Sequence, residues 1–263
     1  MNAMLLAIDV GNTNIDLGVF QGDALIQSWR LQTLRDRTAD ELGLLVSGLF
    51  ARAGLAEANV AGIAMASVVP PLTAPMIAMV ERYFGKRVLV VDATVDTGMP
   101  IRYEHPAEVG ADRIVSAIGA LSLYGRQGRS LIVCDFGTAT TLDAVNAQGE
   151  YLGGAICPGV SISADALFQR AARLPRIEVR KPATVIGRTT VGAMEAGLFY
   201  GYVGMVEGLV RRITGELGDQ PVCVATGGLA PVIAPETTLI DHVEPDLTLK
   251  GLKIVWDRHS TRR

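Results

Sequence analysis

The chain has 263 residues, which allows one large domain or two of ordinary size with a substantial core. Its 24 basic and 27 acidic residues leave no cationic surplus for a nucleic acid or an anionic membrane surface. No apolar run reaches the roughly 18 residues of a membrane span, and the start lacks the basic residues of a signal peptide. We therefore expect a cytoplasmic location, with no nucleic-acid or membrane partner.

Cysteines and the basic C-terminal end carry no clear signal of chemistry. Cys134, Cys157 and Cys223 have no spacing typical of a metal site, and they lie in or beside apolar stretches. Buried free thiols are expected rather than a disulfide or a catalytic nucleophile. The basic residues at 258–263 are interpreted as a frayed terminus.

The first half of the chain predicts a hairpin followed by alternating helices and strands. An apolar strand at residues 5–8 leads into the turn Asp-Val-Gly-Asn-Thr-Asn at residues 9–14, and a second strand ends in a Gly-containing turn at residues 21–23. The later elements are a strand around residues 29–31, a helix at 39–53, a strand at 63–69, a helix at 74–84 and a strand at 87–91.

The second half repeats this order after a helix at residues 112–124, which we expect to join the halves. A strand at residues 131–134 leads into the turn Asp-Phe-Gly-Thr-Ala-Thr at 135–140. Helices follow at 164–172 and 191–217, and strands at 222–225 and 238–241. The repeated β-β-β-α-β-α-β order predicts an α/β fold with mixed sheets and helices outside them, and with ligands at strand ends.

The two Asp-x-Gly turns have residue types suited to nucleotide phosphates. Their glycines let the backbone approach a ligand, and their Asn and Thr side chains are short donors. The aspartate at each strand end is an oxygen ligand for a hard cation such as Mg²⁺. One such turn is most often an ordinary hairpin turn. Two such turns at equivalent positions in the two halves of the chain favour binding of a polyphosphate.

Five segments together carry a resemblance to a known family. They are residues 9–13, Gly-Ala-Asp-Arg at 110–113, residues 135–140, Gly-Ala-Ile-Cys-Pro-Gly at 154–159, and Gly-Arg-Thr-Thr at 187–190. From Leu5 to about Val255 the chain resembles the type III pantothenate kinases, within the superfamily of acetate and sugar kinases, Hsp70 and actin. The resemblance implies two duplicated ribonuclease-H-like domains of the actin-like ATPase fold, residues 1–115 and 116–263, with mixed five-stranded sheets flanked by helices.

The same resemblance implies an enzyme that phosphorylates pantothenate with ATP, the first step of coenzyme A biosynthesis, as a homodimer. The pantothenate hydroxyl must lose its proton as it attacks the γ-phosphate, so a carboxylate base is required. The resemblance implies Asp112 as this base, whereas the residue alone would be interpreted as a helix cap. Implied cofactors are Mg²⁺ and a monovalent cation, K⁺ or NH₄⁺, whose ligand is Asp135; by itself Asp135 could merely end its strand or hold Mg²⁺ with Asp9.

Further positions follow from the resemblance residue by residue. Implied pantothenate contacts are Tyr103, Gly110, Ala111, Asp112, Arg113 and Thr190. Implied ATP contacts are Asp9, Val10, Gly11, Asn12, Thr13, Asn14 and Thr138, with Gly227 and Gly228 toward the adenosine. Without the resemblance, Tyr103 could be a core aromatic, Arg113 a surface ion pair and Thr190 a helix N-cap. Thr190 is implied to act across the dimer interface, and glycines at 197, 201, 204 and 208 permit close packing of their helix there or within the chain.

Three other functions stay open at this point. A nucleotide-binding regulator of the accessory-factor type could use the same fold, although the chain has no helix-turn-helix extension. A sugar kinase of the superfamily usually carries larger insertions than this compact chain has. A phosphatase of the exopolyphosphatase type would use the same turns to aim a water molecule.

Overall fold

The computed structural model describes residues 3–92, 95–125, 128–171 and 173–261. The chain forms two compact units, and each is built around its own sheet. The N-terminal unit comprises residues 1–99, 103–119 and 247–263, and the C-terminal unit comprises residues 100–102 and 120–246. These units differ from two halves divided at one point of the chain, because the last segment returns to the first sheet.

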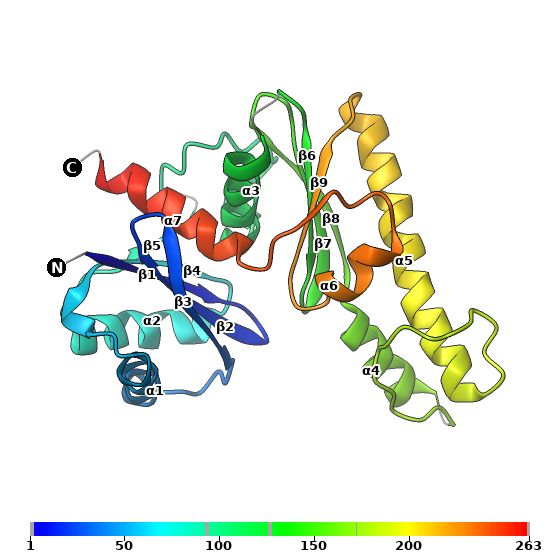
Figure 1. Ribbon diagram of the computed structural model, residues 1–263, viewed down its shortest axis with the longest axis horizontal. Helices are drawn as coiled ribbons and strands as arrows, with labels where there is room; N and C mark the ends of the chain where they lie inside the picture. Colours follow the sequence, from blue (N-terminus) through cyan, green and yellow to red (C-terminus); the bar gives the residue numbers. More distant parts are fainter. Residues whose placement is uncertain (1–2, 93–94, 126–127, 172, 262–263) are drawn as a thin grey trace. The chain divides into compact units, whose positions relative to one another are not determined.

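The sheet of the N-terminal unit has the order β3-β2-β1-β4-β5. Its strands are β1 (Met4–Val10), β2 (Asn14–Gln21), β3 (Ala24–Gln32), β4 (Val60–Ser67) and β5 (Leu89–Val90). The first three pair antiparallel, whereas β1–β4 and β4–β5 pair parallel. Apart from Asp9, every residue of β1 is buried, because helices cover both faces of the sheet: α1 and α2 one, α7 the other (Figure 1).

The helices of this unit begin and end at residues with clear local causes. They are α1 (Ala39–Arg52), α2 (Pro70–Met79), α7 (Leu247–Ser260) and the first part of α3 (Ala111–Tyr124). Thr38 and Glu41 form a capping box at the start of α1, and the Thr38 backbone N–H donates to Glu41, which lowers the pKa of that carboxyl. Two prolines open α2, which passes into a π-helical turn at Val80–Phe84 before the left-handed Gly85.

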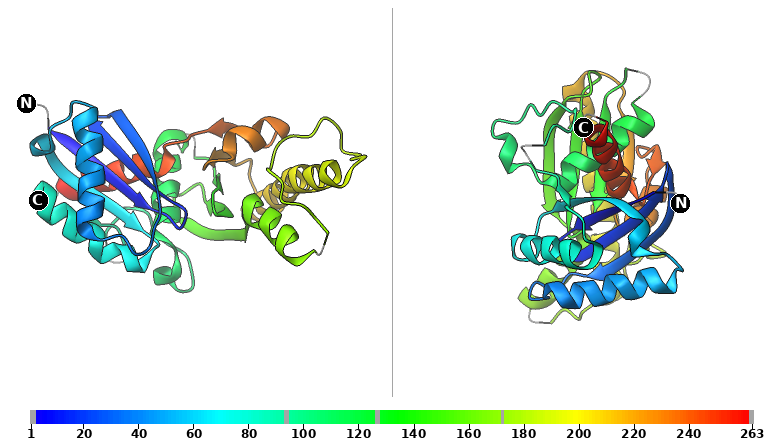
Figure 2. Two further views of the ribbon diagram at one scale, coloured as in Figure 1. Left: turned by 90° about the horizontal axis from the view of Figure 1, so that it is seen from below. Right: turned by 90° about the vertical axis from the view of Figure 1, so that its left-hand side faces the viewer.

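The C-terminal unit repeats this strand arrangement. Its strands are β6 (Leu131–Phe136), β7 (Ala139–Val145), β8 (Tyr151–Pro158), β9 (Val222–Thr226) and β10 (His242–Val243), in the sheet order β10-β9-β6-β7-β8. Its helices are α4 (Val160–Arg170), α5 (Thr190–Leu217) and α6 (Ala230–Ile233), found in Figure 2 by their green, yellow and orange colours. They contribute to one core with β6 and β9. In both sheets the first strand lies between the second and the fourth, which confirms the predicted duplication.

Short 3₁₀ turns lie at Glu57–Asn59, Pro106–Glu108 and Ala234–Glu236. No helix among the described residues is long and apolar enough to span a bilayer.

Four expectations about local structure were wrong. The helix expected at residues 164–172 begins at Val160 and ends at Arg170, and residue 172 lies outside the described part. The last strand is His242–Val243 rather than residues 238–241, because Asp241 uses its carboxylate and its backbone N–H to bond the backbone of Cys223. The second helix begins at Pro70 rather than at residue 74. Arg258 is not in a frayed terminus but in α7, where it lies 3.5 Å from Asp96, and residues 262–263 lie outside the described part.

Close contact between α7 and α3 depends on Gly251. A Cβ at this position would lie 1.8 Å from the carbonyl oxygen of Val115, a backbone atom that cannot rotate away. We expect Gly251→Ala to lower the free energy of unfolding by about 1–3 kcal/mol, as overpacking of a core does. Gly48→Ala is the matched control in α1, where a Cβ meets nothing within 4 Å, and it should stabilise by up to about 1 kcal/mol. Urea unfolding of both variants measures the difference, and equal effects would contradict the packing argument.

Candidate active site

The first turn closes tightly at the carboxyl end of β1. The backbone N–H of Gly11 donates to the carbonyl of Asn14 at 2.9 Å, and a Cβ on Gly11 would lie only 3.0 Å from that same oxygen. Asn12 and Thr13 are exposed at the tip, while Asp9 is half-buried at the strand end. The turn therefore presents short polar groups and backbone to a ligand, with one carboxylate behind them.

Residues 110–113 reach the same edge of this sheet. The backbone N–H of Val68, just after β4, donates to the carbonyl of Val10 at 3.0 Å. Gly110 is close to Val68, since a Cβ on Gly110 would lie 3.5 Å from Val68 Cγ1. The carboxyl ends of two parallel strands thus bring the first turn and the start of α3 to one edge, where ligands bind in α/β sheets.

Asp112 is the second residue of α3 and lies in the first turn of the helix. The carbonyl of Gly110 accepts from the backbone N–H groups of Arg113 and Ile114 at 3.1 and 3.2 Å. Asp112 Oδ1 accepts from the backbone N–H of Arg113 at 2.8 Å, which fixes the carboxylate at the helix start. A Cβ on Gly110 would lie 2.5 Å from this oxygen, so a side chain at position 110 would clash with the Asp112 carboxylate.

The second turn has the same construction in the C-terminal unit. Asp135 is half-buried near the end of β6, Gly137 N–H donates to the carbonyl of Ala139 at 3.1 Å, and Thr138 is exposed. Gly227 follows the parallel strand β9 with a φ of +87°, and a Cβ there would lie 2.4 Å from Asp135 Oδ1. Both carboxylates, Asp112 and Asp135, therefore have a glycine directly against an oxygen.

The remaining predicted residues lie in varied surroundings. Tyr103, Ala111 and Arg113 are half-buried in the N-terminal unit. Thr190 is the exposed first residue of α5, and the capping oxygen belongs to Thr189, which accepts from the backbone N–H of Gly192 at 3.0 Å. The interpretation of Thr190 as an N-cap is therefore wrong.

Metal binding would depend on a bound phosphate. No cluster of three His, Cys, Asp or Glu side chains suited to a metal occurs within the described residues. Mg²⁺ is commonly held by one or two carboxylates together with substrate phosphates, so single aspartates such as Asp9 and Asp135 fit a cation that arrives with a nucleotide.

Sequence reasoning missed a segment that is bonded to the first turn. Thr33 donates from its backbone N–H to the carbonyl of Thr13 at 2.9 Å and from its hydroxyl to the carbonyl of Gly11 at 2.7 Å. Arg35 Nη2 donates to Asn12 Oδ1 at 3.3 Å. The sequence signal was the turn at residues 21–23, which predicts that the strands pair as a hairpin. The structure fixes the register, with a shift near Val19 that pairs Asn14 with Gln32 and so brings Thr33 to the turn.

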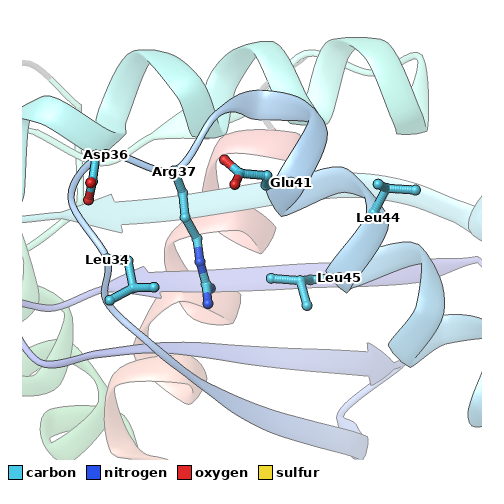
Figure 3. Close-up of a pocket in the computed structure, with 6 residues that line it drawn as sticks. All are labelled: Leu34, Asp36, Arg37, Glu41, Leu44 and Leu45. Atoms are coloured by element: carbon cyan, nitrogen blue, oxygen red, sulfur yellow. The ribbon is translucent and has the colours of Figure 1, made fainter.

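A pocket of about 460 Å³ lies beside this segment at the start of α1. Its lining residues are Leu34, Asp36, Arg37, Glu41, Leu44 and Leu45. In Figure 3 the Arg37 side chain extends between Leu34 and Leu45. None of the predicted site residues lines this pocket, so it is a neighbour of the first turn rather than the predicted site itself.

Two sheets of one strand order, each with an Asp-x-Gly turn at its first hairpin, define the duplicated ribonuclease-H-like fold of actin-like ATPases and sugar kinases. Solved structures agree on the fold. A putative Baf family transcriptional activator from Campylobacter jejuni has a TM-score of 0.63 at 17% identity, covering 97% of this chain and 99% of its own. An inorganic polyphosphate/ATP-glucomannokinase from Arthrobacter has a TM-score of 0.53 at 18% identity, covering all of both chains.

Sequence comparison identifies the family within this class. The family profile of type III pantothenate kinase matches residues 5–212. A type III pantothenate kinase of Brevibacillus brevis is 52% identical over 258 residues, 98% of this chain and 100% of the relative. One of Geobacter sulfurreducens is 52% identical over 256 residues, 97% of this chain and 99% of the relative. The chain belongs to the type III pantothenate kinase family.

Thiol reactivity should distinguish the cysteines, which are all free as expected. Cys134 Sγ lies 3.6 Å from Cys223 Sγ in the core, and this hydrogen bond together with burial raises the pKa of the Cys134 thiol. The folded protein therefore holds Cys134 neutral at mildly alkaline pH, whereas the unfolded chain ionises it at its ordinary value. At pH 8 we expect a thiol reagent to modify only the half-buried Cys157 in the native protein, and all three cysteines in urea. Rapid native modification of Cys134 would contradict this.

Proposed function

We propose that this protein transfers the γ-phosphate of ATP to the terminal hydroxyl of pantothenate, giving 4′-phosphopantothenate in the first step of coenzyme A biosynthesis. The observation that carries the proposal is membership of the family over nearly the whole chain, with relatives of the same name at 52% identity. A cytoplasmic location, where ATP and pantothenate are present, belongs to the same proposal.

Residues of the N-terminal unit have different roles in the reaction. Asp112 accepts the proton of the attacking hydroxyl, since a positioned carboxylate is the acceptor such a transfer needs. Arg113 and Tyr103, with the backbone of Gly110 and Ala111, bind and orient pantothenate. The backbone and short side chains of residues 9–14 hold phosphate oxygens, as does Thr138 in the C-terminal unit. Mg²⁺ supplies charge neutralisation on the phosphates when bound.

A coupled assay of ADP release tests the proposal directly. The purified protein is given ATP and Mg²⁺ with pantothenate, with a panel of sugars, or with no acceptor. We expect release of ADP that depends on pantothenate, and mass spectrometry should show one phosphate on the product. Equal release with and without pantothenate, or activity on sugars alone, would refute the assignment.

A regulatory role on the same fold is not favoured. The Campylobacter jejuni protein that shares the fold is described as a transcriptional activator, but its 17% identity shows the fold alone. The relatives that cover nearly all of this chain at 52% identity are named as kinases.

Asp112→Asn should separate catalysis from folding. Asparagine keeps the shape and an oxygen for the backbone N–H of Arg113, which Asp112 Oδ1 contacts at 2.8 Å, so the fold should be kept. It cannot accept the hydroxyl proton, and we expect turnover to fall about 10²–10⁴-fold with ATP affinity unchanged. Steady-state kinetics and nucleotide titration measure both effects. Turnover near that of the wild type would return Asp112 to a structural role.

We propose Asp135 as a ligand of a monovalent cation. Gly227 and Gly137 lie close to Asp135 Oδ1, and these two positions present backbone rather than a side chain to this oxygen. One carboxylate with backbone carbonyl oxygens suits a weakly hydrated ion, and such an ion prevents the carboxylate from repelling the nucleotide phosphates.

Potassium or ammonium should therefore activate the enzyme. We expect near-inactivity in Na⁺ or Tris buffer, recovery with K⁺ at constant ionic strength, and loss of this response in Asp135→Asn. Initial rates against K⁺ concentration measure it. A flat dependence in the wild type would remove the monovalent site and leave the kinase assignment in place.

A homodimer is part of the proposal. Cβ atoms placed at Gly197, Gly201 and Gly204 of α5 would meet no atom within 4 Å in the described part of the chain, so this glycine face is not packed internally. A second copy that packs there would explain the small residues, and would let Thr190 act across the interface. Sedimentation equilibrium should give twice the chain mass of 27.9 kDa, and a monomeric mass would refute the dimer.

A further inference from the structure

The two Asp-x-Gly turns contain no positively charged side chain. Residues 9–14 and 135–140 hold two aspartates and no lysine or arginine. The triphosphate of ATP carries about four negative charges, and one bound Mg²⁺ neutralises two of them. Phosphate-binding loops of other NTPases include a lysine for this reason. A fixed positive charge from another part of the chain would balance part of the remaining negative charge.

Arg35 stands beside the first turn in a fixed segment. The two hydrogen bonds from Thr33 to the carbonyls of Thr13 and Gly11 hold the chain there, two residues before Arg35. The guanidinium reaches the tip of the turn, where Nη2 donates to Asn12 Oδ1 at 3.3 Å. This single long bond uses one of the five donors of an arginine.

The charge of Arg35 is not neutralised by an ion pair. Among the described residues it has no carboxylate within salt-bridge distance, whereas Arg30 pairs with Asp16 at 2.6 Å and Arg82 pairs with Asp40 at 2.5 Å. Arg37, two residues on, points into the pocket of Figure 3, and its Nη1 is buried. Arg35 is therefore the exposed guanidinium at the turn, and planar N–H pairs bind phosphate oxygens well.

We propose that Arg35 binds the phosphate tail of the nucleotide at the first turn, and that Thr33 is the positioning residue that holds this arginine and the turn together. The proposal deepens the proposed kinase function and rests on ATP being the phosphate donor. Asn12 Oδ1 orients the guanidinium before the nucleotide binds, so little side-chain freedom is lost on binding.

Nucleotide affinity without any acceptor tests Arg35. Titration calorimetry compares ATP, ADP and adenosine on the wild type, Arg35→Ala, Arg35→Lys and the control Arg52→Ala, whose arginine is exposed at the far end of α1. We expect Arg35→Ala to weaken ATP about 10–100-fold, the range for a charge-assisted hydrogen bond, and to leave adenosine unchanged. Arg35→Lys should recover part of the affinity, and Arg52→Ala should match the wild type. Unchanged ATP affinity, or equal losses for ATP and adenosine, would overturn the proposal.

Thr33 has its own test. Thr33→Val keeps the backbone bond to Thr13 and the side-chain volume but loses the hydroxyl bond to Gly11, and Thr33→Ser restores it. We expect the valine variant to raise the KM for ATP several-fold with the KM for pantothenate unchanged, and serine to rescue it. Equal KM values for ATP in all three proteins would refute the positioning role.

These outcomes are distinct from failure of the kinase assignment. If the wild type binds ATP but does not phosphorylate pantothenate, the proposed acceptor is wrong, while the calorimetric difference between Arg35→Ala and Arg52→Ala still decides the role of Arg35. If pantothenate is phosphorylated and Arg35→Ala binds ATP as the wild type does, the kinase assignment holds and the role of Arg35 fails.

Discussion

Parallel pairing of the first and fourth strands in each sheet is the constraint on which the rest of the structure depends. In the N-terminal unit β4 pairs with β1 along the whole length of β1, so the two strands end together. The chain then continues from Val10 into the first turn and from Ser67 toward Val68, against which Gly110 lies. The pairing of β9 with β6 does the same for Asp135 and Gly227. A fold with a different fourth strand would keep both turns and lose these neighbours.

Glycines at these sheet edges matter because they have no side chain, so other atoms can approach the backbone closely. Gly110 and Gly227 each allow a carboxylate oxygen to occupy the place that a Cβ would take. Gly251 has a different use, because it lets α7 approach the backbone of α3. The first two make room for a carboxylate and the third allows close helix packing, although all three are the same residue type. Their roles differ because the atoms opposite them differ: a carboxylate oxygen in two cases, and a main-chain carbonyl in the third.

The first turn is also supported from the side. The β2–β3 hairpin delivers Thr33 next to Thr13, and the segment that follows leads into the capped start of α1. Two hydrogen bonds on the turn's own carbonyls therefore link the first turn to the segment that leads into a regular helix. A turn of Gly, Asn and Thr has little packing of its own, so its shape depends on such neighbours.

Local sequence determined the elements and the site motifs of this protein. Apolar periodicity and turn residues gave α1, α3, α5 and both hairpins within a few residues, because these depend on contacts between neighbours in the chain. The strand repeat predicted the duplicated fold, and the motif at residues 110–113 indicated the family. The tertiary structure alone decided that α7 returns to the first sheet, that Gly227 lies against Asp135, and that Thr33 and Arg35 support the first turn. These contacts join residues far apart in sequence, and a one-dimensional pattern does not specify which distant residues pack together.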